Sequence, residues 1–423
     1  METIKFIGRA LRYRNYRLFF AGQSVSLVGT WLQLTALPWL VYRMTSSVFL
    51  LGVVGFLSQI PTFILTPLAG VLIDRFDRRR LLVITQIASM LQALILWVLL
   101  VSGHMSVPAI LALSFLLGLI NAIDIPARQS FVVDMVESKN DLGNAIALNS
   151  SMVHAARLIG PTIAGVLIGI AGEASCFLLN ALSFLAVIFS LLKMNIRPVL
   201  KASSDTSLWQ GIQEGISYVR GSVPMKAILI LMAIVSLSGM PYMVFMPVFA
   251  KDIFNGTPST LGFLIAASGL GALCGAVYLA SRQGIKGLGR IMAGSSALFG
   301  LGLMVFALSK ILWLSWAAMV LIGFGMIIQF AASNTILQTI VEDTKRGRVM
   351  SLYTVAFMGM TPIGSFIEGA LAHRIGVSTT IFIGGAVCLI AAIGFARQLP
   401  FIHQAIQRQR EQEALETIVD PIN

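Results

Sequence analysis

The sequence predicts an all-α membrane protein with twelve membrane-spanning helices, and three observations lead to this class. Of the 423 residues, 57% are hydrophobic and only 11% are charged, whereas soluble proteins carry about 25% charged residues. The apolar residues form twelve runs close to the roughly 20 residues that cross a bilayer as a helix. These runs lack the apolar–polar alternation of membrane β-strands. The composition therefore excludes a soluble enzyme and a disordered scaffold.

The twelve predicted spans follow one another with short polar breaks, such as those at 45–47, 102–106 and 255–258. Gly and Pro occur inside the runs, and membrane helices tolerate both residues better than soluble helices do. The predicted spans are 18–42, 48–73, 81–102, 107–131, 143–171, 174–193, 225–250, 259–282, 290–309, 313–337, 349–372 and 376–399.

The basic residues predict the orientation of these spans. With the N-terminus on the cytoplasmic side, 25 of the 30 Lys and Arg residues fall on inner segments, including two assigned to the loop between spans 4 and 5. Lys and Arg accumulate in cytoplasmic loops, so both termini are expected in the cytoplasm. The net charge of +12 is then a topology signal and not a nucleic-acid-binding surface. The other five basic residues are Arg43, Arg157, Lys251, Lys310 and Arg374.

A long polar stretch divides the spans into two groups of six. We assign 1–193 to an N-terminal bundle, 194–224 to a cytoplasmic linker, 225–400 to a C-terminal bundle and 401–423 to a cytoplasmic polar tail.

The linker contains a segment, 207–220, whose apolar residues recur at helical spacing. Leu208, Ile212, Ile216 and Val219 would share one face of a helix. The pattern predicts an amphipathic helix lying on the inner membrane surface. Docking of this helix onto a partner is the alternative.

The two halves of the chain resemble each other. GPTIAGVL at 160–167 matches GSFIEGAL at 364–371 with an offset of 204 residues, and each follows a charged inner loop. Weak repeats at half-chain distance are typical of transporters whose substrate site lies between two bundles near the middle of the membrane.

The segment GVLIDRFDRRR at 70–80 resembles the loop signature of the major facilitator superfamily, Gly-x-x-x-Asp-Arg-x-Gly-Arg-Arg/Lys, with Asp77 in place of the second Gly. A glycine lets helices approach closely, and an acid can face the positive end of a neighbouring helix. The resemblance implies a lock that holds the two bundles closed on the cytoplasmic side; a basic loop that only sets orientation is the alternative. The counterpart at 275–282 lacks the acid. The predicted lock residues are Gly70, Asp74, Arg75, Arg78 and Arg79.

Two further segments, 121–136 and 144–165, are similar to the exporter branch that contains the enterobactin exporter, macrolide efflux proteins and transmembrane secretion effectors. Gly160, Pro161 and Gly165 resemble the span-5 element of antiporters, where small residues and a proline let span 5 pack and bend against span 8. Ordinary small-residue packing is the alternative. Together the resemblances imply the major facilitator fold, with two pseudo-symmetric six-helix bundles.

Charged residues inside spans are costly and are candidates for function. We expect Asp124 in span 4 to pair with Arg157 in span 5, and proton binding at Asp124 to break this pair; a static ion pair is the alternative. Glu368 in span 11 is either an outer interfacial carboxylate or a site for a proton or a cationic substrate. His154, one turn before Arg157, either titrates near neutral pH or packs between helices.

Polar, aromatic and methionine side chains on spans that face the other bundle are candidates for a substrate cavity. Such a cavity suits a bulky amphipathic molecule. The candidates are Gln23, Trp31, Gln33, Asn149, Tyr242, Met243, Gln329 and Asn334.

The sequence contains no GxxxxGK[ST], HExxH or GxSxG motif and no Cys/His cluster, so we expect no enzyme activity, ATP site, cofactor or metal. We expect a monomeric secondary transporter of the bacterial cytoplasmic membrane that exports a small amphipathic molecule (a drug, macrolide or siderophore) in exchange for protons. Its partners would be the substrate, protons and the lipid bilayer, with no nucleic acid. A lipid or lysolipid flippase, a nutrient importer, and a non-transporting membrane sensor or assembly partner are the alternatives.

Overall fold

The computed structural model describes residues 9–136, 138–195, 208–282, 287–342 and 345–419. For residues 67–72, 74, 75, 139, 140, 208–212 and 401–419 it describes the backbone alone. Throughout these ranges every regular element is helical, and eleven helices are long and apolar enough to cross a membrane. In order, the elements of the first half are η1 (Arg9–Arg12), α2 (Arg14–Thr45), α3 (Val48–Arg75), α4 (Arg78–Val101), α5 (Val107–Asp134) and α6 (Lys139–Lys193).

Helix α6 contains two spans. Gly172 has φ 74° and ψ 172°, a conformation that glycine adopts without steric cost. The Cys176 sulfur lies 4.0 Å from the Ala164 carbonyl oxygen, although a straight helix would separate these residues by about 18 Å. The chain therefore reverses at Gly172, between the fifth and sixth predicted spans.

The second half follows the linker helix α7 (Leu208–Gly221) and contains two irregular spans. Pro241 and Pro247 lie in the seventh span, where proline removes a backbone donor and disturbs the preceding turn. The eleventh span includes a π-helical segment, and α15 continues beyond the predicted end at 399. In order, the elements are α8 (Val223–Ser238), η2 (Met240–Phe245), α9 (Met246–Val248), η3 (Phe249–Ile253), α10 (Pro258–Ala280), α11 (Leu288–Leu308), α12 (Leu312–Ile340), α13 (Arg346–Thr354), η4 (Val355–Gly359), α14 (Met360–Ile375) and α15 (Val377–Val419).

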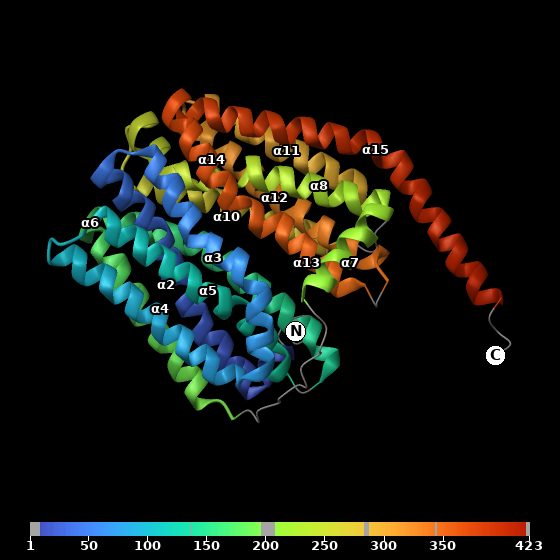
Figure 1. The fold of residues 1–423 in the computed structure, drawn as a ribbon. Coiled ribbons are helices and arrows are strands. Elements are labelled where there is room, and N and C mark those ends of the chain that lie inside the picture. The colour runs from blue at the N-terminus through green and yellow to red at the C-terminus, as the bar shows by residue number, and fades with distance from the viewer. Residues whose placement is uncertain (1–8, 137, 196–207, 283–286, 343–344, 420–423) are drawn as a thin grey trace.

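The two halves form two helical bundles that lie side by side, α2–α6 in one and α8–α15 in the other (Figure 1). We call the end of the molecule that carries the α3–α4 turn, α7 and the C-terminal end of α15 the basic end (Figure 1). The opposite end, which carries the α2–α3 turn and Gly172, is the distal end.

Glycines bring the bundles together at the distal end. Gly165 of α6 lies against Gly262 of α10, where a Cβ on Gly165 would be 2.7 Å from the Pro258 carbonyl oxygen. Gly369 of α14 lies against Gly52 of α3, with the Cα of Gly52 2.9 Å from the position of a Cβ. Gly165 and Gly369 are separated by the repeat offset of 204. The repeat therefore places equivalent glycines at the two inter-bundle contacts.

The bundles separate toward the basic end. Along the face of α6 that meets α10, Pro161 is buried, Arg157 and His154 are half-buried, and Ser150 is exposed. In the eleventh span, Ser365 is likewise buried against α3, whereas Thr354 is exposed. Among the described residues, both helices thus become more exposed toward the basic end, whereas they pack against the opposite bundle at the distal end.

The predicted amphipathic helix is present as α7. Glu214 forms ion pairs with Lys345, at 3.9 Å, and with Arg348 at the start of α13. Gly215 packs against Arg348. These contacts attach the linker helix to the C-terminal bundle; Leu208 and Ile212 lie among the residues described by backbone alone.

Candidate functional site

The centre of the molecule is marked by Arg157, which joins the two bundles. Its Nη2 donates a hydrogen bond to Ser268 Oγ at 3.3 Å, and its Nη1 and Nη2 lie 4.0 and 3.9 Å from the Met326 sulfur. The guanidinium carbon lies 5.9 Å from the centre of the Trp31 ring. Arg157 and Trp31 come from α6 and α2, and Ser268 and Met326 from α10 and α12. We call these four residues and Tyr242 the central site.

The central site lies deep within the spans. Arg157 is 15 residues from Gly172 and 18 from Lys139, or about 22 and 27 Å along the helix. It is half-buried and lies where the face of α6 begins to open toward the basic end. Arg157 therefore lies at the boundary between the buried and the more exposed part of this face.

Tyr242 supports the C-terminal side of the site. Its hydroxyl is 3.0 Å from Ser268 Oγ, and its ring lies edge-on to Phe299. Trp31 and Tyr242 were predicted as cavity residues and lie at the central site. Ser268 and Met326 were not predicted, because a lone serine or methionine in an apolar helix has no sequence signal that separates it from packing residues.

The other predicted cavity residues lie elsewhere in this conformation. Gln33 is 3% exposed and belongs to a polar network inside the N-terminal bundle, where it donates to Gln92 at 3.0 Å and accepts from Asn180 at 2.8 Å. Its expected place in the cavity is therefore wrong for this conformation, because its amide is satisfied within its own bundle.

The remaining cavity candidates have mixed surroundings. Gln23 and Gln329 are buried, and the Gln23 carbonyl oxygen and both amide atoms of Gln329 have no hydrogen-bond partner among the described residues. Asn149 is half-buried. Asn334 accepts a hydrogen bond from Gln338 at 2.6 Å, and Met243 is half-buried. Their role in a cavity stays a prediction.

Asp124 does not pair with Arg157 in this structure. Its carboxylate accepts hydrogen bonds at 2.7 Å from Thr85 Oγ1 and from Gln86 Nε2, both on α4. Arg128, one turn along α5, lies 3.6 Å from it. The expected pair fails because Arg128, which lies in the same predicted span (107–131) as Asp124, is one turn away on α5 and supplies the nearer cation.

Glu368 and His154 occupy different surroundings. Glu368 is 7% exposed and its carboxylate faces α15, where a Cβ on Gly384 would lie 3.5 Å from Oε1. It is therefore enclosed in the C-terminal bundle and is not the exposed interfacial group that was one of its two interpretations. His154 is half-buried, and its Nδ1 has no partner in the described part of the chain.

The described residues of the predicted lock stabilise the N-terminal bundle. Arg78 Nη1 donates to both oxygens of Asp134, at 3.1 and 3.0 Å. Arg79 donates to the carbonyl oxygens of Leu191 and Leu192 at the end of α6, at 2.6 Å each. Gly70, Asp74 and Arg75 lie in α3, but their side-chain surroundings fall outside the described residues. The lock between bundles stays a prediction.

Asp77, which replaces the glycine of the signature, caps helix α4. Its carboxylate accepts hydrogen bonds from the backbone N–H groups of Arg79 and Arg80, at 2.9 and 3.3 Å. We expect Asp77→Ala to lower the stability by about 1 kcal/mol and Asp77→Gly by only a few tenths. Thermal unfolding of the purified variants checks this order; equal losses would show that the cap does not stabilise α4.

A polar contact between the bundles joins the two glycine contacts at the distal end. The Tyr42 hydroxyl of α2 donates to the Asp252 carboxylate of η3, and the Lys251 ammonium lies 5.3 Å from the centre of the Tyr42 ring. We expect Tyr42→Phe to increase labelling of a cysteine placed near Asp252 by an impermeant maleimide, since the hydrogen bond across the bundles is lost. Thr30→Val, which changes a hydroxyl of α2 that donates to the Ser26 carbonyl oxygen of the same helix, is the control. Equal labelling of both variants and the parent would contradict this role.

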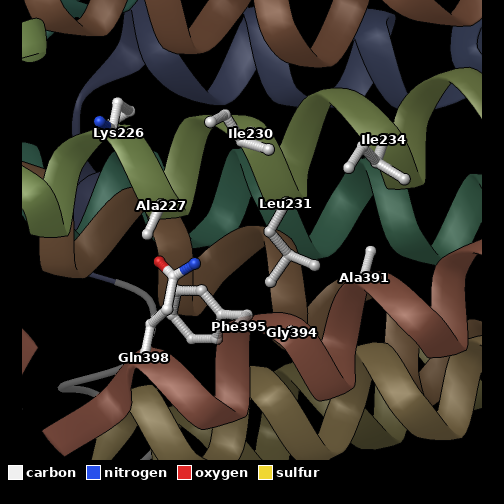
Figure 2. A pocket seen from close by; sticks show the side chains of 9 residues that line it. All are labelled: Lys226, Ala227, Ile230, Leu231, Ile234, Ala391, Gly394, Phe395 and Gln398. Atoms are coloured by element: carbon white, nitrogen blue, oxygen red, sulfur yellow. The ribbon is translucent and has the colours of Figure 1, made fainter. Parts of the chain in front are cut away.

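A separate cavity of about 220 Å³ lies between α8 and α15 within the C-terminal bundle (Figure 2). Leu231 points from α8 toward Ala391 and Gly394 of α15. Apart from Lys226 and Gln398 the lining is apolar. No residue of the central site contributes to it, so this cavity is not part of the inter-bundle site.

Comparisons with known proteins agree with this architecture. The chain matches the family described as "Transmembrane secretion effector" over residues 9–421. It is 26% identical to the staphyloferrin A transporter of Staphylococcus aureus, over 90% of this chain and 95% of that protein. It is 23% identical to macrolide efflux protein A of Streptococcus pyogenes, over 90% of this chain and 96% of that protein.

Among solved structures, the nucleoside transporter NupG superposes with a TM-score of 0.70 at 13% sequence identity, covering 92% of this chain and 99% of that one. At this identity the match shows the fold alone. The predicted fold class and the resemblance to transmembrane secretion effectors are confirmed.

Proposed function

Because the chain belongs to the transmembrane secretion effector family of major facilitator transporters, we propose that it exports a small amphipathic molecule from the bacterial cytoplasm by alternating access. Two relatives are named as a transporter of staphyloferrin A and as a macrolide efflux protein. Membership of this family supports export as the general function of the protein. The proposed orientation, with the basic end in the cytoplasm, rests on the Lys and Arg distribution.

The observation that carries the proposal is the central site, in which side chains of both bundles meet around Arg157. A site at the boundary between two bundles is exposed to one side at a time when the bundles rock. This proposal is supported by the contacts between the bundles at the distal end and by the greater exposure of α6 and of the eleventh span toward the basic end. This arrangement corresponds to the state that takes up a substrate from the cytoplasm.

We place proton coupling at Asp124. Its carboxylate binds Thr85 and Gln86 of α4 and faces Arg128 of α5, so its protonation would remove the charge that holds these groups together. Acidic residues inside spans commonly form proton relays in transporters. Loss of the contacts between α4 and α5 would then bias the N-terminal bundle toward the other conformation.

Purified protein in sealed vesicles tests this function. A panel of macrolides, carboxylate siderophores and dyes is loaded under an imposed pH gradient, and substrate movement and internal pH are recorded together. Antiport predicts substrate movement coupled to opposite proton movement. Transport without proton movement would support a flippase or uniporter, and accumulation in the opposite direction an importer. A protein that moves no compound of the panel would contradict the export proposal and favour a membrane sensor or assembly partner.

A further inference from the structure

Arg157 is a cation whose charge is not neutralised by the residues around it. Among the described residues no carboxylate lies within ion-pair distance of Arg157, and its Nε is buried without a hydrogen-bond partner. The guanidinium contacts one hydroxyl, one thioether and one aromatic ring. A guanidinium offers five N–H donors, and most of those of Arg157 have no oxygen or nitrogen acceptor among the described residues.

The two acidic side chains that were predicted inside spans, and that the structure describes, face groups other than Arg157. Asp124 is held by Thr85, Gln86 and Arg128, and Glu368 faces α15 inside the C-terminal bundle. His154, one turn from Arg157 on α6, adds no negative charge. An unpaired charge inside a membrane protein is costly and marks a functional group by default. The missing partner of Arg157 is therefore expected to come from outside the chain.

We propose that Arg157 binds an oxyanion of the transported molecule, a carboxylate or a phosphate. This inference deepens the proposed export function and rests on it for the identification of the ligand as a substrate. A guanidinium binds both oxyanions through two parallel hydrogen bonds. The hydroxyl of Ser268, 3.3 Å from Nη2, lies where it can donate to the same group.

The rest of the central site fits the apolar part of such a molecule. The Trp31 ring and the Met326 thioether both border the guanidinium, and aromatic and thioether groups offer large, adaptable apolar contact. The preferred ligand is thus an anionic amphiphile. A cationic amphiphile would be repelled by the uncompensated charge of Arg157.

The test uses the purified full chain and three ligands that share a 1-naphthylmethyl group: 1-naphthaleneacetate, its uncharged amide, which has the same shape, and 1-naphthylmethyl phosphate. Binding is measured by calorimetry for the parent, Arg157→Gln and Arg157→Lys. The control is Arg282→Gln, which removes an exposed arginine at the end of α10. A charge-assisted hydrogen bond contributes enough for a difference of about 10- to 100-fold.

We expect the parent and Arg282→Gln to bind at least one of the two anions about 10- to 100-fold more tightly than the amide. The anion that is preferred identifies a carboxylate or a phosphate as the natural group. Arg157→Gln should lose this preference and keep the affinity for the amide, which also shows that the variant is folded. Arg157→Lys should keep part of the preference, because the charge remains and the paired geometry is lost.

Equal binding of the anions and the amide by the parent would overturn the proposal, as would a preference that survives in Arg157→Gln. The vesicle assay separates this failure from failure of the export function. A protein that transports a substrate but shows no anion preference contradicts the role of Arg157 alone. One that prefers anions but moves no substrate supports an anion site in a protein that is not an exporter.

Discussion

Replacing Gly165 by leucine is expected to abolish transport and to shift the protein toward an arrangement that is open at the distal end. A Cβ at this position would lie 2.7 Å from the Pro258 carbonyl oxygen and 2.9 Å from the Cα of Ser259. Both atoms belong to the backbone of α10, which cannot move aside as a flexible side chain would. Overpacking of this kind costs about 1–3 kcal/mol or more, which shifts a two-state equilibrium by about 5- to 150-fold.

Gly169→Leu is the matched control, because Gly169 lies one turn along the same helix and a Cβ there would meet its nearest neighbour at 4.0 Å. Transport in vesicles and labelling of distal-end cysteines by an impermeant reagent give the two measurements. We expect the control to transport like the parent and Gly165→Leu to lose at least nine-tenths of the rate. Unchanged transport by Gly165→Leu would contradict closure of the distal end through α6 and α10.

Replacing Asp124 by asparagine is expected to remove the dependence of transport on the pH gradient while leaving substrate binding intact. Asparagine keeps the size of the side chain and can still bind Thr85 or Gln86, but it has no charge for Arg128 and no proton to exchange near neutral pH. Uptake driven by an imposed pH gradient should fall to the rate without a gradient, whereas the substrate dissociation constant should change by less than about threefold.

The control for this variant is Glu173→Gln, which removes the acid of another ion pair in the N-terminal bundle, with Arg43 Nε at 2.6 Å. This pair lies at the distal end, away from the proposed proton site. Glu173→Gln should keep its response to the gradient. If Asp124→Asn also kept it, the coupling site would have to be elsewhere, with Glu368 the next acid to change.

The sequence predicted the spans well because each depends on a local quantity, the length of an apolar run. It also placed Gly165 and Gly369 in equivalent positions, because the internal repeat aligns each residue of one half with the residue 204 positions later. The pairing of Asp124 was predicted wrongly, because Arg128 was counted with the basic residues of the cytoplasmic loop although the predicted span 107–131 contains it. In the structure Arg128 lies inside α5, one turn from Asp124.

The central site was only half predicted for a different reason. Helical spacing shows which residues share a face, but it does not show which neighbouring helix that face meets. Gln33 and Trp31 both lie on α2, yet Gln33 packs inside its own bundle and Trp31 lies against Arg157. Ser268 and Met326 become part of the site only because α10 and α12 bring them to α6, which is a property of packing.

The central claim is that two rigid bundles rock around Arg157. Pulsed electron–electron double resonance, which measures the distance between two spin labels, tests this claim without knowledge of the substrate. One label pair is placed at the basic end, on Ala147 of α6 and Ser351 of α13, and a second at the distal end, on His104 and Lys310. All four residues are exposed, and Cys176, Cys274 and Cys388 are first replaced.

Each pair is measured in the parent and in Gly165→Leu. The account predicts that the variant shortens the basic-end distance and lengthens the distal-end distance together. Distances that stay unchanged, or that change at one end only, would contradict it.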